Sequence, residues 1–100
     1  MMMIHVYLTE GDREKRASLA DVVLRELHDN SLATGATLLR AVGGFGEHRE
    51  IHKATILNPE AHLPLVIEFF EENDDAMRAV NYLKKHPGLK IISWPITIHQ

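Results

Sequence analysis

The chain contains no cysteine among its 100 residues. Disulfide bonds, a thiolate nucleophile and a zinc site with cysteine ligands are therefore excluded. No apolar run approaches the roughly 20 residues that a membrane-spanning helix requires. The first residues also lack the lysine or arginine residues that open a secretory signal peptide. We therefore expect a cytoplasmic protein that is not itself inserted in a membrane.

The chain also lacks a strong charge of either sign, because 11 lysine and arginine residues oppose 14 aspartate and glutamate residues. The basic residues are scattered, which is not the pattern of a broad nucleic-acid-binding surface. No Ser/His/Asp order, no Walker-type Gly-Lys-Ser motif and no pair of carboxylates in an apolar setting is present. These absences predict a protein that is not an enzyme, does not bind nucleic acid and holds any anion at a local site.

The first third of the chain predicts a strand followed by a helix. The length and the hydrophobic fraction of 45% are those of one domain spanning residues 1–100. Side chains of different polarity alternate over residues 2–8, which is the period of a β-strand. Asp12 is a suitable N-cap, and the helical spacing of apolar residues after it predicts a helix over about 13–29. Its buried stripe consists of Leu19, Ala20, Val23, Leu24 and Leu27.

The middle of the chain predicts two strands separated by a long loop. Residues 36–42 form the first of these strands, which begins after Gly35 and ends at a cluster of glycines. Residues 43–62 show no sustained period, and a loop of this length in a compact domain is uncommon unless it is functional or disordered. Residues 63–70 are apolar on both faces except at Glu68, as expected of a strand covered on two sides.

The last third predicts a second helix and a final edge strand. Asn73 or Asp74 caps the helix, which ends at 86–88, and its buried stripe is Ala76, Val80 and Leu83, helped by Met77 and Ala79. The strand over 92–98 contains Pro95, which cannot donate to a ladder, so it should lie at a sheet edge. The resulting βαββαβ order predicts an α+β fold, a four-stranded antiparallel sheet with both helices on one face.

Two helices cover only one face of such a sheet. The other face is expected to carry Tyr7, Leu39, Val66 and Phe70. Exposing that much apolar surface is unusual for a soluble monomer, so we expect the protein to self-associate.

Three stretches of the chain carry a family resemblance: Gly-Ala-Thr-Leu-Leu-Arg-Ala-Val-Gly-Gly-Phe-Gly at 35–46, Ile-His-Lys-Ala at 51–54 and Leu-Pro-Leu-Val-Ile-Glu at 63–68. They resemble an uncharacterised prokaryotic family of PII-like proteins over nearly the whole chain. The run that ends in Gly-Phe-Gly is also similar to the PII signal-transduction proteins, in which this motif lies at the base of a long loop. The resemblance implies a ferredoxin-like subunit, a homotrimer, and adenine nucleotides bound in clefts between subunits.

The resemblance also implies site residues and a partner. Thr37 would lie near the base of a nucleotide, and the glycine cluster would offer backbone to its phosphates. The 43–62 loop would dock on a partner protein, such as a membrane transporter or channel that the trimer regulates. The candidate ligand-binding residues are Thr37, Arg40, Gly43, Gly44, Phe45, Gly46 and Lys90. No other cofactor is indicated.

Two roles remain open for the Arg40 side chain. It follows two leucines on the strand that leads into the glycines, so its guanidinium can reach a phosphate or carboxylate at the cleft. Its alternative role is an ion pair with Glu68 of another subunit.

An alternative function rests on two histidines in the long loop. His48 and His52 have the i, i+4 spacing that places two imidazoles on one helical face, which suits a divalent metal ion. In an extended segment the same rings would lie about 13 Å apart and could not share an ion. This alternative is a trimeric divalent-metal-binding protein similar to the CutA-like cation tolerance proteins.

Overall fold

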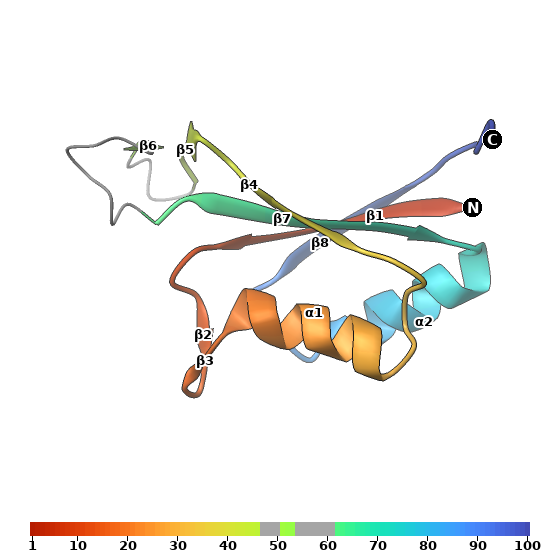
Figure 1. Cartoon of the computed structure of the whole chain (residues 1–100), viewed down its shortest axis with the longest axis horizontal. Coiled ribbons are helices and arrows are strands. Elements are labelled where there is room, and N and C mark those ends of the chain that lie inside the picture. The colour runs from red at the N-terminus through yellow and green to blue at the C-terminus, as the bar shows by residue number, and fades with distance from the viewer. Residues whose placement is uncertain (47–50, 54–61) are drawn as a thin grey trace.

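A computed structural model describes residues 1–46, 51–53 and 62–100. Two helices lie on one face of a four-stranded antiparallel sheet with the strand order β4-β7-β1-β8 (Figure 1). The strands are β1 (Met2–Thr9), β4 (Thr37–Arg40), β7 (Pro64–Glu71) and β8 (Lys90–Pro95), and the helices are α1 (Leu19–Asp29) and α2 (Asn73–Leu83). The expected α+β architecture and the edge position of the last strand are confirmed.

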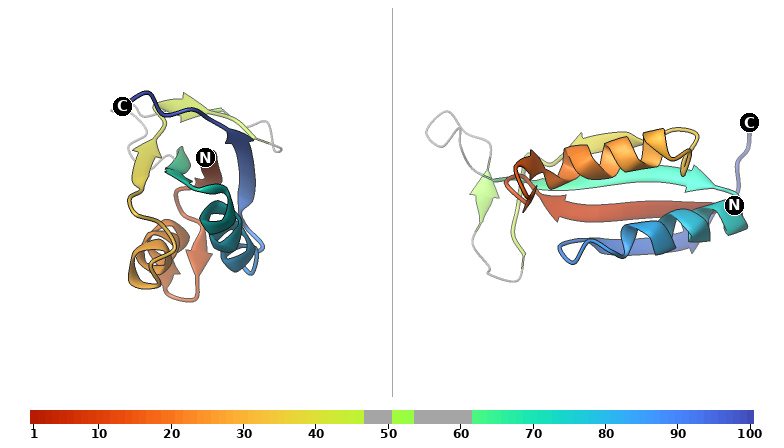
Figure 2. Two further views of the ribbon diagram at one scale, coloured as in Figure 1. Left: turned by 90° about the vertical axis from the view of Figure 1, so that its right-hand side faces the viewer. Right: turned by 90° about the horizontal axis from the view of Figure 1, so that it is seen from below.

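The hydrophobic core lies between the sheet and the helices. Figure 2 shows both helices running side by side over the same face of the sheet. Successive strand residues point to opposite faces, so alternate residues of β1 and β7 are buried against the helices. The fully buried large side chains are Ile4, Val6, Val23, Leu27, Leu63, Ile67, Phe69 and Leu83.

The helical stripes agree with the sequence pattern at most positions. The buried residues of α1 are Leu19, Ala20, Val23 and Leu27, and those of α2 are Ala76, Ala79, Val80 and Leu83. Leu24 is only partly buried, and the expected contribution of Met77 was wrong, because its side chain is 44% exposed. Met77 follows Ala76 and is therefore rotated about 100° around the helix, away from the sheet.

The first helix begins at Leu19 and not near residue 13. Residues 13–18 instead form a hairpin of β2 (Arg13–Glu14) and β3 (Ala17–Ser18), with Lys15 at a positive φ of 56°. This stretch contains no large apolar side chain to bury, so the packing that stabilises α1 begins only at Leu19. Asp12 accordingly does not cap the helix, because its carboxylate accepts a hydrogen bond of 2.8 Å from the backbone N–H of Thr9.

The opposite face of the sheet carries exposed apolar side chains, as expected. The exposed fractions are 46% for Leu39 and Phe70, 42% for Ile92, 38% for Tyr7 and 37% for Trp94, and Val66 is partly buried. We call this surface the open face. In its central row the strand register aligns Thr37, Glu68, His5 and Ile92 across all four strands. His5 Nε2 lies 2.7 Å from Glu68 Oε2, which places a polar pair within the apolar surface.

The placement of the core predicts that two substitutions lower the free energy of unfolding by very different amounts. Phe69→Ala removes a ring that is 2% exposed and should lower the free energy of unfolding by about 3–5 kcal/mol. Met77→Ala trims a side chain that points to solvent, so its effect should stay within about 0.5 kcal/mol. Urea unfolding of both variants measures the difference, and equal losses would contradict this packing.

Candidate functional site

The sequence-predicted site residues occupy three places in the structure. Thr37 and Arg40 begin and end β4, and the glycine cluster begins after two further residues. Lys90 begins β8, at the same end of the sheet as Arg40 but on the opposite edge. Since β7 and β1 lie between these edges, three interstrand spacings of about 4.8 Å separate the backbones. One chain therefore does not bring Lys90 together with the other candidates.

Thr37 lies at a hollow of about 380 Å³ beside the first residues of β4. The hollow is lined by Thr34, Gly35, Ala36, Thr37, Glu68, Phe69 and Phe70. Glu68 is the register partner of Thr37, and both lie on the open face. A hydroxyl, a carboxylate and a half-exposed aromatic ring therefore meet at one edge of this face. The hollow combines apolar surface with a few polar groups, as ligand sites do.

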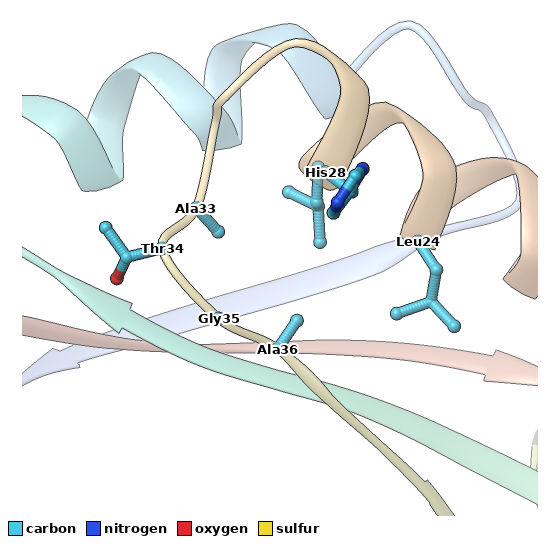
Figure 3. Close-up of a pocket in the computed structure, with 7 residues that line it drawn as sticks. Leu24, His28, Ala33, Thr34, Gly35 and Ala36 are labelled. Atoms are coloured by element: carbon cyan, nitrogen blue, oxygen red, sulfur yellow. The ribbon is translucent and has the colours of Figure 1, made fainter.

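A second hollow of about 280 Å³ lies on the other side of the same segment, against α1. Figure 3 shows residues 33–36 running between the helix and the sheet, with the side chains of Leu24 and His28 on the helix side. Buried Glu71 anchors this segment, because its Oε2 accepts hydrogen bonds from the N–H of Thr34 at 2.9 Å and from the Thr34 hydroxyl at 2.8 Å. The anchor fixes the backbone that lines both hollows.

Arg40 forms an ion pair with Glu10 of the same chain. Its Nε lies 2.7 Å from Glu10 Oε2 and its Nη2 lies 3.2 Å from Oε1, so the contact is bidentate. The Arg40 hydrogen bond is the main cause that lowers the pKa of Glu10, and the backbone N–H of Leu63 also contributes. Within the same chain Glu68 contacts His5, and a pair of Arg40 with Glu68 of another subunit stays a prediction.

Sequence reasoning missed Glu10, although a signal was present. Glu10 directly follows β1, and in the antiparallel sheet the end of β1 lies beside the beginning of β7 and the end of β4. A carboxylate and a guanidinium at these two strand ends are therefore brought to the same end of the sheet. The pair joins them across β7.

The first two residues of the glycine cluster are extended and paired rather than turned. Gly43–Gly44 form a short strand, β5, that pairs with β6 (His52–Lys53). Among the described glycines, only Gly11 has a positive φ, so the cluster does not adopt the left-handed backbone expected of an anion-binding nest. The requirement at Gly44 is space, since an added Cβ would lie 3.0 Å from Cγ of Pro64.

The histidine pair of the metal hypothesis cannot be placed, because His48 lies outside the described residues. Within residues 1–46, 51–53 and 62–100, no group of three or more histidine, aspartate or glutamate side chains is arranged to hold a metal ion.

In the same part of the chain, neither helix is long and apolar enough to cross a membrane.

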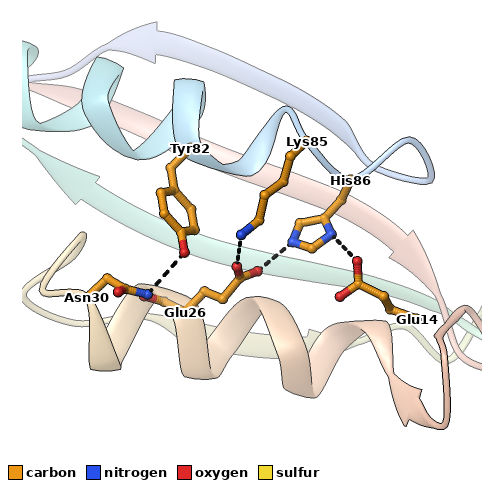
Figure 4. Close-up of polar contacts among 6 residues, drawn as sticks. All are labelled: Glu14, Glu26, Asn30, Tyr82, Lys85 and His86. Atoms are coloured by element: carbon orange, nitrogen blue, oxygen red, sulfur yellow. Dashed lines mark hydrogen bonds and ion pairs between the residues drawn. The ribbon is translucent and has the colours of Figure 1, made fainter.

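A buried polar cluster joins the two helices and the β2–β3 hairpin (Figure 4). His86 is 4% exposed, and its Nδ1 lies 3.0 Å from Oε1 of Glu14. Its Nε2 contacts Glu26, which also pairs with Lys85. Both ring nitrogens are therefore occupied by carboxylates, which leaves neither free to bind a ligand. We assign this cluster to stability rather than to the site.

Comparisons of the sequence with known proteins identify a family and curated relatives. The DUF190 family, described as "Uncharacterized ACR, COG1993", matches residues 1–94. A "UPF0166 protein" from Aquifex aeolicus (strain VF5) is 27% identical over 88 residues, which cover 87% of this chain and 83% of the relative.

Similar solved structures include a divalent ion tolerance protein, CutA1 from Ehrlichia chaffeensis, with a TM-score of 0.57, 18% identity and coverage of 98% of this chain and 84% of that one. They also include CPII, a nitrogen regulatory PII-like protein from Thiomonas intermedia K12 bound to ADP, AMP and bicarbonate. Its TM-score is 0.57 with 14% identity, and the match covers 99% of this chain and 88% of that one. At these identities the likeness shows the ferredoxin-like fold alone.

The buried cluster predicts a pH dependence of stability. Burial acts to raise the pKa of Glu26, but the hydrogen bonds from Lys85 and His86 outweigh it and lower the pKa. A carboxyl whose pKa is lower in the folded state stabilises the fold above its unfolded-state pKa, and this stability is lost as the pH falls through the folded-state pKa. Glu26→Gln should therefore cost about 1–3 kcal/mol at pH 7 and less at pH 3.

Urea unfolding at both pH values checks this expectation. Glu72→Gln is the matched control, because Glu72 is exposed at the start of α2 and makes no side-chain capping bond. An equal loss at pH 3 and pH 7 for Glu26→Gln would show that the ionised carboxylate is not what stabilises the cluster.

Proposed function

Since the chain belongs to the DUF190 family of uncharacterised PII-like proteins, we propose that it is a non-enzymatic regulatory protein that senses a small anionic ligand. The proposed ligand is an adenine nucleotide, bound in clefts between the subunits of a homotrimer. The proposed output is docking of the 43–62 segment on a partner protein, for which a membrane transporter or channel is the candidate. The observation that carries the proposal is the hollow beside Thr37, because its lining residues Thr37, Glu68 and Phe70 lie on the open face.

The open face supports the assembly. Side chains from all four strands contribute apolar surface to it, and in the described part of the chain no helix covers it (Figure 2). Apolar surface of this extent on a sheet usually marks an interface. Further copies of the chain packed on this face would also close the hollow at Thr37 and Glu68. The ligand cleft would then be shared between subunits.

The spacing of the candidate residues supports a nucleotide. Thr37 and Phe70 offer a hydroxyl and an aromatic ring, which suit a nucleobase. Arg40 ends the same strand about 10 Å from Thr37, and the cluster formed by Gly43, Gly44, Phe45 and Gly46 follows it. Because Arg40 is the register partner of buried Leu65, its side chain leaves the face opposite to Thr37, so the phosphates of such a ligand would reach it around the β4 edge. Lys90 would come from a neighbouring subunit. The PII-like CPII, whose structure contains ADP and AMP, supports the ligand class.

The assembly predicts a trimer that a single charge disrupts. Light scattering should give the mass of three chains for the native protein. Ile92→Arg places a charge in the central row of the open face and should give a folded monomer, because burying an unpaired charge is strongly unfavourable. Met77→Arg, a matched change at a similarly exposed residue of α2, should leave the trimer intact. A native monomer, or an Ile92→Arg trimer, would contradict the proposal.

The ligand site predicts two losses of affinity. Calorimetric titration of the native protein with ADP and AMP should give saturable heat. Arg40→Ala removes a charge-assisted contact, and Thr37→Val removes a hydroxyl while keeping the shape of the side chain. We expect Arg40→Ala to weaken binding about tenfold or more and Thr37→Val to weaken it by a smaller factor. Thr97→Val, in the exposed C-terminal segment, is the matched control.

The same titration separates the two functions. Gly44→Val is not a clean test of phosphate binding, because the new side chain would collide with Pro64. Saturable heat from zinc or copper ions, with none from nucleotides, would refute the proposal and favour the metal-binding alternative at His48 and His52.

A further inference from the structure

Three N–H donors converge on the carboxylate of Glu10. Two belong to the Arg40 guanidinium, with donor–acceptor distances of 2.7 and 3.2 Å, and the third is the backbone N–H of Leu63 at 3.0 Å. Two parallel guanidinium donors and a backbone amide form the arrangement that proteins use for carboxylate and phosphate groups. The donor set is therefore a built oxyanion site, and its present occupant is a side chain of the same chain.

The occupant can leave while the site stays. The backbone of Glu10 is held in place, because its N–H donates to the carbonyl of Leu63 at 2.9 Å and Gly11 turns the chain at a φ of 90°. The side chains of the pair, by contrast, are partly exposed to solvent. The exposed fraction is 29% for the Glu10 side chain and 53% for the Arg40 side chain. Rotation of the Glu10 side chain would place its charge in water, where it is well solvated. Because about half of the Arg40 side chain is exposed, an external anion can reach it from solvent.

The position of the pair gives such an exchange a consequence. Arg40 precedes the 43–62 segment and Leu63 follows it, and the N–H of Ala41 donates to the carbonyl of Pro64 at 2.9 Å between the same two flanks. Glu10 therefore connects the end of β1 to both sides of the segment. Replacing its carboxylate by a free anion removes that connection without removing the pairing of the flanks with each other.

We propose that Glu10 is a built-in competitor of the ligand, whose carboxylate occupies the donors of Arg40 and Leu63 until an external oxyanion displaces it. This inference deepens the proposed function and rests on its assignment of an anionic ligand to Arg40. The displacing group is a phosphate, either free or carried by a nucleotide. Competition lowers the apparent affinity in proportion to the fraction of molecules in which the site is free, so a pair closed about 90% of the time weakens binding about tenfold.

The test is calorimetric titration of Glu10→Gln with inorganic phosphate and, separately, with ADP. The glutamine keeps the shape of the side chain but removes the charge, so phosphate should bind about tenfold more tightly than to the native protein. Glu72→Gln removes the same charge at an exposed position and should leave the affinity unchanged, which separates local competition from net charge. In the Glu10→Gln/Arg40→Gln double variant the gain should disappear. Phosphate affinity of Glu10→Gln no higher than that of Glu72→Gln would overturn the proposal.

A second measurement keeps the test valid if Glu10→Gln unfolds. In the native protein, nuclear magnetic resonance should show that phosphate shifts the Arg40 Nε–H and the Leu63 N–H signals together. Phosphate that moves neither signal would also overturn the proposal.

The phosphate titration and the ADP titration together separate the competitor hypothesis from the nucleotide function. Tighter phosphate binding by Glu10→Gln without ADP binding by the native protein would refute the nucleotide function and leave the competitor standing. If the native protein and Glu10→Gln bind ADP with equal affinity, the role of Glu10 as a competitor is refuted and the nucleotide function is not.

Discussion

The packing of two helices against one face of the sheet is the constraint on which the rest of the structure depends. Ile4, Val6, Ile67 and Phe69 are buried on that face, and because strand side chains alternate, their neighbours must point to the other side. Those neighbours include Tyr7 and the other exposed apolar residues of the open face. The open face is thus a direct consequence of the core, and it places Thr37 and Glu68 at the edge of a surface suited to another copy of the chain.

The polar contacts at the two ends of the sheet hold the candidate site in position. At one end Glu71 anchors the segment that lines the hollow, and at the other Glu10 occupies the guanidinium of Arg40. In the proposed function, β4 therefore connects a place for a nucleobase at Thr37 with a place for an oxyanion at Arg40, whose side chain leaves the other face of the strand. A buried His86 cluster secures the hairpin and helices on the far side of the core, where it does not take part in either place.

The sequence predicted the elements well where periodic burial decides the structure, and less well where single contacts do. The strands and both helical stripes follow from apolar spacing, which reports which side chains face the core. The start of α1 did not follow, because Asp12 is an equally good residue for a turn and residues 13–18 bury nothing large. Predicting the Glu10–Arg40 pair requires the register of three strands. Predicting the space requirement at Gly44 requires the position of Pro64. Neither constraint leaves a periodic signal.

The central claim is that the open face builds the ligand cleft by bringing subunits together. The most direct test is the ADP affinity of the Ile92→Arg variant, since Ile92 lies on β8, whereas the hollow beside Thr37 is formed by the 34–37 segment and β7. The account predicts that this monomer loses ADP binding although Thr37, Arg40 and their surroundings are unchanged. A monomeric variant that binds ADP as tightly as the native protein would contradict it.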